Sequence, residues 1–414
     1  MTKAWQSTFV LFTLLAVLNP SVSAQIELRQ VDGAIQTGRL NAIKSDGTVV
    51  FEVGKAAKPL EVPMAELVSL RFGNPPVSRH GDDSSLLRFE MASGDVIFGT
   101  VIDGDFDTVR VESVFGRIKL PLDSLERVVC LANAKGLDTR AKVIGDEGQD
   151  VLLVRSKSGV DSVHGSVAKF VRNGVMFEWG DGEESLFAFK KNRVASVSLA
   201  ESEPAEAIKG VHAVVFFRDG SRLTGRLSKS AGSAMKFAHI AGSTLELSVV
   251  SVAEISVRNG RFVHLSDLKA TSVAETPYLQ GGLKYGLNVD QGIRGGPLSI
   301  GVRGFPRGLS VHSRCSVTYD ISRGFESFST AIGVDGAVAN KRVVASIKFT
   351  VLVDDKVVAG PTLCRAGAEP VWLNSIALTG AKKLTLVADF ADNYHFNGWA
   401  VWGSPYMVTK AESR

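Results

Sequence analysis

Residues 213–227 read AVVFFRDGSRLTGRL, and this stretch decides the fold of the first two thirds of the chain. An apolar run meets the pair Asp219-Gly220, and a second run follows around Gly225. Bulky β-branched and aromatic runs favour short strands. Asp-Gly between such runs is a hairpin signal, because glycine accepts a positive φ without a steric penalty. A glycine inside the second strand indicates a bulge or a sharp bend.

The same pattern occurs three more times upstream. The copies read IELRQVDGAIQTGRL from residue 26, LRFEMASGDVIFGTV from residue 87 and VLLVRSKSGVDSVHGSVAKF from residue 151. In every copy two more strand-like runs follow, and an apolar anchor precedes the last strand. The four anchors are Leu67, Leu125, Val194 and Val252. Five short strands in about 45 residues predict a small antiparallel barrel, whose closure removes exposed strand edges.

We therefore predict four small barrels over residues 25–73, 86–133, 150–200 and 211–260. Their pattern resembles that of Sm-like small barrels, which is an analogy of fold and says little about function. Residues 73–85 are rich in Pro, Gly and Asp, and residues 200–210 are acidic without strand character. Both segments are typical of linkers.

Residues 1–24 predict a cleaved signal peptide. Lys3 supplies a basic start, residues 8–18 (TFVLFTLLAVL) are apolar, and small residues precede a cleavage site after Ala24. A retained membrane anchor is the alternative, but the apolar run is shorter than the roughly 20 residues that a span requires. No later stretch is long enough to cross a bilayer. We expect an exported protein of the periplasm or the extracellular space.

Composition is that of folded globular material, with 45% hydrophobic and 22% charged residues. A net charge of +4 with no Lys/Arg stripe gives no indication of nucleic-acid binding. The three cysteines are Cys130, Cys315 and Cys364. An exported chain could pair Cys315 with Cys364, whereas the alternative is three buried thiols that act as small hydrophobic residues.

The last third of the chain differs in its aromatic content. All five Tyr and three of the five Trp lie beyond residue 276. Runs such as SIKFTVLV (346–353) and KLTLVADF (383–390) predict strands separated by polar turns. No helical periodicity is sustained. Two packed antiparallel sheets are therefore the expected architecture of this segment.

Five motifs in this segment occur in the order known from one family. They are GVRGFPRGLSVH (301–312), FSTAIGVD (328–335), IKFTVLVDDK (347–356), LTGAKKLTLVAD (378–389) and NYHFNGW (393–399). The segment resembles the NPCBM family of carbohydrate-binding modules over about residues 277–410. The resemblance implies a galactose-binding-like β-sandwich (jelly roll) for residues 262–414, of the kind often appended to glycoside hydrolases. The fold prediction for the whole chain is all-β.

Sugar binding requires an aromatic ring for the C–H face of the pyranose and planar polar groups for its hydroxyls. Residues 393–399 supply both kinds of group in one loop. The candidate carbohydrate-binding residues are Trp399, Asn397, His395, Asn393, His312 and Asp335. Each has a purely structural alternative. Trp399 and Trp402 lie three apart in a strand and point to opposite faces, so one of them belongs to the core. His312 could bind loop backbone and Asp335 could cap a turn.

We expect a non-catalytic protein whose partner is a polysaccharide or glycoconjugate, with galactose-like sugars as candidates. The chain has no nucleophile elbow, zinc motif or phosphate loop. No cofactor is indicated. Sandwiches of this kind commonly hold a structural Ca²⁺, but no run here has an ordered ligand spacing. Two alternatives remain: a structural cell-envelope protein that binds other proteins through its repeats, and an accessory subunit of a secreted glycoside hydrolase.

Overall fold

The computed structural model describes residues 25–54, 58–73, 85–134, 148–157, 159–203, 206–231, 234–279, 281–392 and 394–410. These residues form antiparallel strands and single-turn 3-10 helices, with no α-helix among them. The all-β prediction is therefore confirmed. Residues 1–24, with the predicted signal peptide, lie outside the described residues. No described helix has the length and apolar character needed to span a membrane.

The first twenty strands form four repeats of five. Repeat 1 contains β1 (Ile26–Gln30), β2 (Ile35–Ile43), β3 (Val49–Val53), β4 (Leu60–Val62) and β5 (Leu67–Arg71). Repeat 2 contains β6 (Leu87–Met91), β7 (Val96–Gly104), β8 (Thr108–Ser113), β9 (Gly116–Pro121) and β10 (Leu125–Cys130). Repeat 3 contains β11 (Asp150–Arg155), β12 (Val160–Val171), β13 (Gly174–Trp179), β14 (Glu183–Ala188) and β15 (Val194–Ser198). Repeat 4 contains β16 (His212–Phe217), β17 (Arg222–Ala231), β18 (Ala234–His239), β19 (Thr244–Ser248) and β20 (Val252–Arg258).

Within every repeat the strands pair in the order last, first, second, third, fourth. The second strand carries a register shift shortly after its glycine, as between Leu40 and Ala42 in repeat 1 and between Leu227 and Lys229 in repeat 4. This shift bends the long strand so that it can pair with the first strand at one end and with the third strand along its length.

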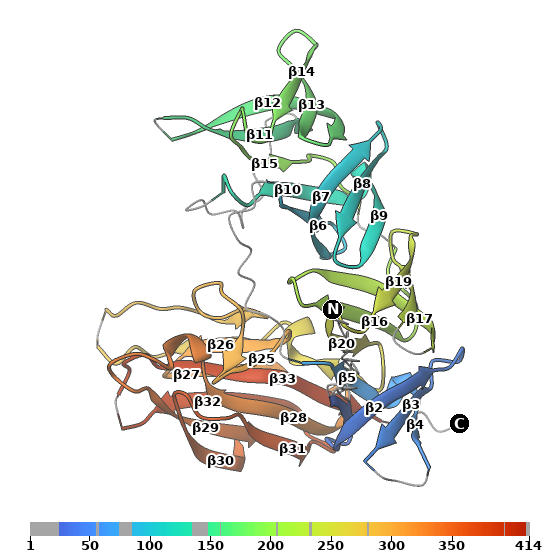
Figure 1. Ribbon diagram of the computed structural model, residues 1–414. Coiled ribbons are helices and arrows are strands. Elements are labelled where there is room, and N and C mark those ends of the chain that lie inside the picture. Colours follow the sequence, from blue (N-terminus) through green and yellow to red (C-terminus); the bar gives the residue numbers. More distant parts are fainter. Residues whose placement is uncertain are drawn as a thin grey trace, which may run out of the picture.

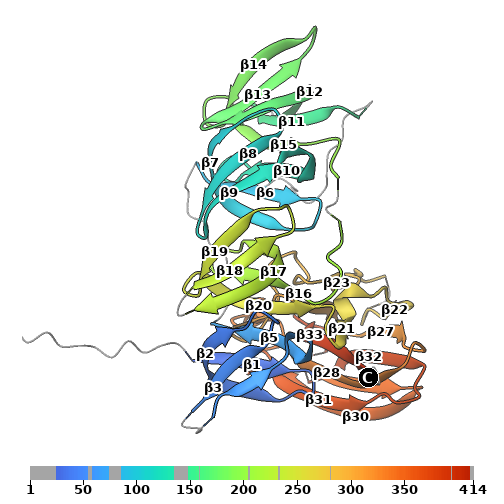
Figure 2. The same cartoon turned by 90° about the vertical axis from the view of Figure 1, so that its right-hand side faces the viewer.

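The repeats are stacked in the order 1, 4, 2, 3, which differs from their order in the chain (Figures 1 and 2). Repeats 1 and 4 join through their last strands, where Leu70 pairs with Ile255. Repeats 2 and 3 join in the same way, where Val128 pairs with Val197. These two contacts are called the last-strand junctions. They cover strand edges by pairing one repeat with another, in addition to the pairing inside each repeat.

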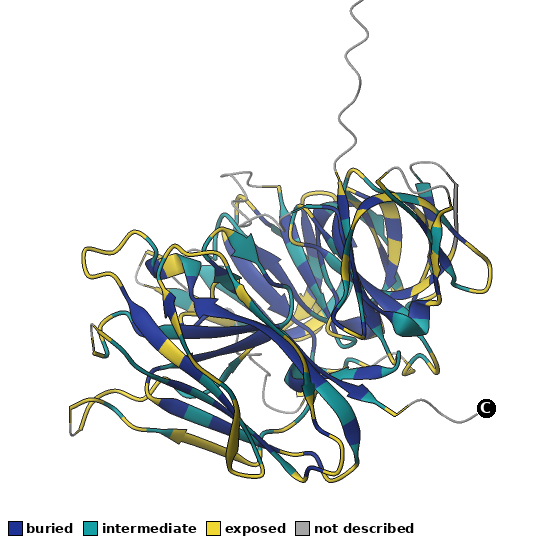
Figure 3. Cartoon of the chain, turned by 90° about the horizontal axis from the view of Figure 1, so that it is seen from below, coloured by how far each residue is buried: buried dark blue, intermediate teal, exposed yellow. Residues whose placement is uncertain are grey.

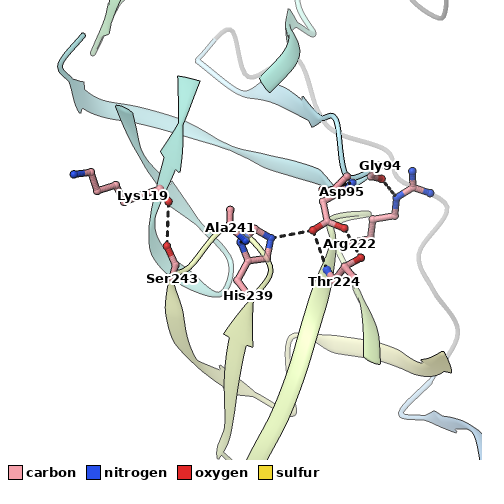
Figure 4. Close-up of polar contacts among 9 residues, drawn as sticks. Gly94, Asp95, Lys119, Arg222, Thr224, His239, Ala241 and Ser243 are labelled. Carbon is pink, nitrogen blue, oxygen red and sulfur yellow. Dashed lines mark hydrogen bonds and ion pairs between the residues drawn. The ribbon is translucent and has the colours of Figure 1, made fainter. Parts of the chain in front are cut away.

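Repeats 2 and 4 join differently, through the hairpins formed by their first two strands (Figure 4). Val96 pairs with Arg222, and the Arg222 Nε donates to the Gly94 carbonyl oxygen at 2.6 Å. The His239 Nε2 lies 2.9 Å from the Asp95 Oδ2, and both side chains are buried. We call this contact the hairpin junction.

The C-terminal segment is a sandwich of two antiparallel sheets. The first sheet orders β23 (Asn288–Val289), β26 (Gly308–His312), β33 (Trp399–Thr409), β28 (Phe325–Val334) and β31 (Val371–Ala377), with β21 (Phe262–His264) also paired to β33. The second sheet orders β22 (Ser272–Glu275), β27 (Cys315–Asp320), β32 (Lys383–Phe390), β29 (Ser346–Val353) and β30 (Lys356–Arg365). Figure 3 shows the sandwich beside the ring of strands of the nearest repeat, with buried residues lining the inner faces.

The sandwich packs directly against repeat 1. The Arg29 guanidinium lies 3.5 Å from the ring centre of Trp372, and Arg303 forms an ion pair with Glu27 at 2.5 Å. Phe262 and Tyr406 belong to the same hydrophobic cluster as the cores of the repeats. The sandwich is therefore packed against the stack rather than joined to it only by a linker, because residues of its first sheet belong to the packed interior of the stack.

The three cysteines are buried, unpaired thiols. Burial raises the pKa of Cys130 and Cys315 to about 12 and that of Cys364 to about 11. The sequence left two alternatives, a Cys315–Cys364 disulfide or three buried thiols. The structure has three buried thiols that act as small hydrophobic residues.

Candidate functional site

Two predicted site residues meet at one end of the first sheet. His312 ends β26 and Trp399 begins β33, and the two residues are register partners. Trp402, three residues further along β33, is fully buried in the sandwich core. Alternation along the strand puts Trp399 and Trp402 on opposite faces, and Trp399 is half-buried at the strand end, where it still packs against the sandwich core. The opposite end of β33 contacts repeat 1, since the Tyr406 hydroxyl donates to the Gln30 carbonyl oxygen.

The loop between β23 and β24 (Ser299–Ile300) contributes one side chain that lies over the Trp399 ring. The exposed Arg294 places its guanidinium carbon 5.2 Å from the centre of the Trp399 ring. The Trp399 backbone is fixed on both sides, because its N–H donates to the Asn397 carbonyl at 2.7 Å and its carbonyl accepts from the Asp335 N–H at 2.9 Å. The indole is thus held in place by its backbone and approached by one cationic side chain.

His312 forms a stacked pair with Tyr285, with the ring centres 4.7 Å apart. Its Nδ1 lies 2.7 Å from the Ser313 carbonyl oxygen. Burial lowers the pKa of His312, although the Ser313 carbonyl and the carboxylate of Glu275 act in the opposite direction. The lowered pKa favours the neutral imidazole, in which Nδ1 donates to the Ser313 carbonyl and Nε2 is left as an acceptor.

His395 lies among aromatic rings in the loop before β33. Its ring stacks on Tyr278 at 5.2 Å and on Phe396 at 4.6 Å. Its Nδ1 is buried and has no hydrogen-bond partner among the described residues. Tyr394 and Phe396 remain more than half exposed. The exposed aromatic faces beside His395 are suited to stacking against a ligand, whereas its buried Nδ1 is not accessible to one.

The remaining predicted site residues lie at the same end but differ in access. The Asn397 Nδ2 donates to the Val343 carbonyl at 2.9 Å, so the amide holds the loop. Asp335 is only 1% exposed, and its carboxylate accepts from the Ala337 N–H at 2.9 Å. Burial raises the pKa of Asp335, and the Ala337 and Ser299 hydrogen bonds act against this rise. Asn393 lies outside the described residues.

Three further residues belong to this end of the sandwich and were not singled out from the sequence. They are Tyr278, Tyr285 and Arg294. The concentration of all five Tyr beyond residue 276 was the signal that pointed to the two tyrosines. Nothing in the sequence around Arg294 distinguishes it from other arginines. We refer to Tyr278, Tyr285, His312, His395 and Trp399 as the aromatic patch.

Calcium is the one metal that the resemblance raised. No group of three or more His, Cys, Asp or Glu side chains within the described part of the chain is arranged to hold a metal ion. The described side chains therefore do not supply a carboxylate cage for Ca²⁺.

Comparison with known families matches the C-terminal segment to the family model described as the NPCBM/NEW2 domain, over residues 261–408. Residues 261–408 are an NPCBM/NEW2 domain. The resemblance read from the five sequence motifs is thereby confirmed. The match covers about a third of the chain and includes every residue of the aromatic patch.

The chain is also similar to one curated protein and to solved structures. The chain is 25% identical over 117 residues to "Putative endo-alpha-N-acetylgalactosaminidase" of Renibacterium salmoninarum, an alignment that covers 28% of this chain and 8% of the relative. A CBM51 module of Clostridium perfringens GH95 in complex with methyl-galactose is 19% identical with a TM-score of 0.31, over 36% of this chain and 99% of that one. CBM51-2 in complex with GlcNAc, with the INT domains of Clostridium perfringens ZmpB, is 22% identical with a TM-score of 0.33, over 50% and 40% of the two chains. This chain thus spans only a small part of the length of the Renibacterium relative.

Proposed function

We propose that the NPCBM/NEW2 domain binds glycans through the aromatic patch, and that the protein acts as an exported, non-catalytic glycan-binding protein. The observation that carries the proposal is the meeting of Trp399, His312 and His395 with Tyr278 and Tyr285 at one end of the sandwich. This end is remote from repeat 1, so a ligand there does not compete with the packing of the sandwich on the stack.

The chemistry of the patch fits a neutral sugar. Ring faces take the C–H face of a pyranose, while the Nε2 of His312 supplies an acceptor and the guanidinium of Arg294 supplies donors for hydroxyls. The side chains of Asn397 and Asp335 form hydrogen bonds with backbone groups and so hold the loops beside the patch in place. N-acetylgalactosamine and its parent sugar galactose are the first sugars to test, because the name of the Renibacterium relative refers to N-acetylgalactosamine.

The test is a glycan array with the full chain and with the variant Trp399→Ala. Loss of one stacking ring is expected to weaken binding about tenfold, corresponding to about 1.4 kcal/mol. Phe106→Ala is the matched control, since Phe106 is a 72% exposed aromatic residue in repeat 2. It should leave binding unchanged. Binding of no glycan at millimolar concentration, or equal binding by the wild type and Trp399→Ala, would sink the proposal.

Export is part of the proposal and is supported by the composition of residues 1–24. It is tested by N-terminal sequencing of the protein recovered from the envelope or medium of its own cells. A mature N-terminus at Gln25 is expected, and an intact N-terminus in the cytosol would contradict export.

A second candidate function is structural. The stacking of four repeats into one rod, with the sandwich packed on its end, favours a role in spacing or assembly. That role is compatible with glycan binding, because the rod and the aromatic patch use different surfaces.

A further inference from the structure

The hairpin junction between repeats 2 and 4 has an internal two-fold relation. The Thr224 N–H donates to the Asp95 Oδ2 at 2.9 Å, and the Phe98 N–H donates to the Ser221 Oγ at 2.9 Å. Asp95 and Ser221 occupy equivalent places in the two repeats, each directly before the second strand. Thr224 and Phe98 are likewise equivalent, each the third residue of that strand. The same contact is therefore made twice, once in each direction.

The centre of this junction is closed by groups from the third strand and from the neighbouring turns. His239, the last residue of β18, is 4% exposed and contacts Asp95. Phe115 and Phe217 pack with ring centres 4.7 Å apart. The Ser243 Oγ donates to the Lys119 carbonyl oxygen at 3.0 Å. The face of a repeat that makes a hairpin junction thus includes its first hairpin, the end of its third strand and its fourth strand.

Along the stack the two kinds of junction alternate. Repeat 1 meets repeat 4 through last strands, repeat 4 meets repeat 2 through hairpins, and repeat 2 meets repeat 3 through last strands. Repeat 3 contacts repeat 2 through its last strand and lies at the far end of the rod (Figure 2). The face of repeat 3 that is equivalent to the hairpin-junction faces of repeats 2 and 4 therefore lies at the outer end of the molecule.

Register shows what occupies that face in repeat 3. Trp179 pairs with Gly165 just as His239 pairs with Gly225, so Trp179 holds the place of the central histidine. Leu186 pairs with Met176 as Lys119 pairs with Arg110, which gives Leu186 the place of Lys119. Trp179 is 44% exposed and Leu186 is 52% exposed. The Trp179 ring rests edge-on against Phe187 at 6.2 Å.

The opposite end of the rod is different. Val53 holds the place of His239 in repeat 1, and the first hairpin of repeat 1 already contacts the sandwich, since the Ser375 Oγ donates to the Asp32 carbonyl at 2.6 Å. Terminal repeats of stacked arrays normally present a polar outer face. The outer face of repeat 3 carries charged residues, but it also presents Trp179 at the position where repeat 4 has the buried His239 of the junction.

We propose that repeat 3 pairs with repeat 3 of a second copy of this chain, face to face, in the geometry of the hairpin junction. A two-fold contact suits two identical faces, and the internal junction of repeats 2 and 4 already has that relation. The dimer is a rod of eight repeats with one sandwich at each end.

The test is sedimentation or light scattering of the full chain over a range of micromolar concentrations. The wild type is expected to reach twice the mass of one chain. Trp179→Glu should shift the dimer dissociation constant at least tenfold toward monomer, while the melting temperature stays close to that of the wild type because the side chain is 44% exposed. Val357→Glu, at a 58% exposed position of the sandwich, is the control and should leave the mass unchanged.

Salt provides an independent readout. Four carboxylates flank Trp179 on the same hairpin, namely Glu178, Asp181, Glu183 and Glu184. Pairing of identical faces brings these like charges together, so added salt should tighten the dimer. A wild type that stays monomeric, an equal effect of Val357→Glu, open-ended polymers, or association that weakens with salt would each overturn the proposal.

Discussion

At the scale of single residues, Glu254 has the most unusual environment. It lies where repeats 1 and 4 meet beneath the sandwich, 3.9 Å from Arg71, and both side chains are buried. Burial raises the pKa of Glu254 to about 7, although the nearby arginines, Arg71 first, act to lower it. In the unfolded chain the ordinary value is 4.5. The folded protein therefore holds this proton more tightly than the unfolded chain does.

This difference predicts a dependence of stability on pH. Glu254 keeps its proton in both states below pH 4.5, so its contribution to the free energy of unfolding is complete there. The contribution is lost as the pH rises toward about 7, and it stays lost above that value. The loss is on the order of 3 kcal/mol. Denaturant unfolding at pH 5 to 8 should show a smaller fall for Glu254→Gln than for the wild type, and parallel curves would refute the assignment.

The sequence located part of the candidate site at this scale. Trp399, His312 and His395 were found because they lie within family motifs, and the structure brings them to one end of the sandwich. Tyr278, Tyr285 and Arg294 come from a preceding loop that has no motif. Their contacts depend on how that loop folds back over the sheet, which local sequence does not specify.

At the scale of elements, the glycine of the second strand recurs in every repeat. A Cβ built on Gly38, Gly99, Gly165 or Gly225 would lie between 1.9 and 2.5 Å from a backbone oxygen of the adjacent strand. These glycines do not serve a turn, since none of them has a positive φ. They allow the bent second strand to approach the third more closely than any side chain permits.

Gly225→Ala should therefore destabilise the stack. Its Cβ would lie 2.2 Å from the Ala238 carbonyl oxygen, and backbone on both strands must move. We expect a loss of about 1–3 kcal/mol in the free energy of unfolding, the usual cost of overpacking. Gly296→Ala is the control, since nothing lies within 4 Å of its Cβ. Equal stability of the two variants in chemical denaturation would contradict the close-approach argument.

The strands were largely predictable from the sequence, but their partners beyond each repeat were not. Alternation and the Asp-Gly or Ser-Gly turns depend on neighbouring residues, so they appear in the local pattern. The pairing of Leu70 with Ile255 joins distant parts of the chain. All four last strands are similarly apolar, so composition does not reveal which of them pair with one another.

At the scale of the whole molecule, the stacking order makes repeats 2 and 3 an insertion. Repeats 1 and 4 contact each other and the sandwich, whereas repeats 2 and 3 join this unit through the hairpin junction on repeat 4 (Figure 1). The chain leaves the unit after repeat 1 and returns to it at repeat 4. Repeats 1 and 4 with the sandwich should therefore be able to fold without the inserted pair.

We accordingly expect a deletion of residues 86–199, bridged by a flexible linker, to keep a cooperative thermal melt and glycan binding. A deletion of residues 211–260 removes repeat 4, which contacts both repeat 1 and repeat 2, and should give an aggregated or non-cooperative product. Calorimetry of both variants makes the comparison. A folded product from the second deletion and an unfolded product from the first would contradict the view that repeats 2 and 3 are an insertion into a unit of repeat 1, repeat 4 and the sandwich.

The interleaved stacking also has a consequence for how the chain reaches its native state. The buried contact between Asp95 and His239 spans 144 residues, and the ion pair between Glu27 and Arg303 spans 276. Contacts at such separations impose a large loop-closure entropy, which slows folding. The edge of β5 cannot find its partner until β20 has been made, so it stays exposed through most of synthesis. During this interval the unpaired edge of β5 is the part of the chain most exposed to wrong pairing with other strands.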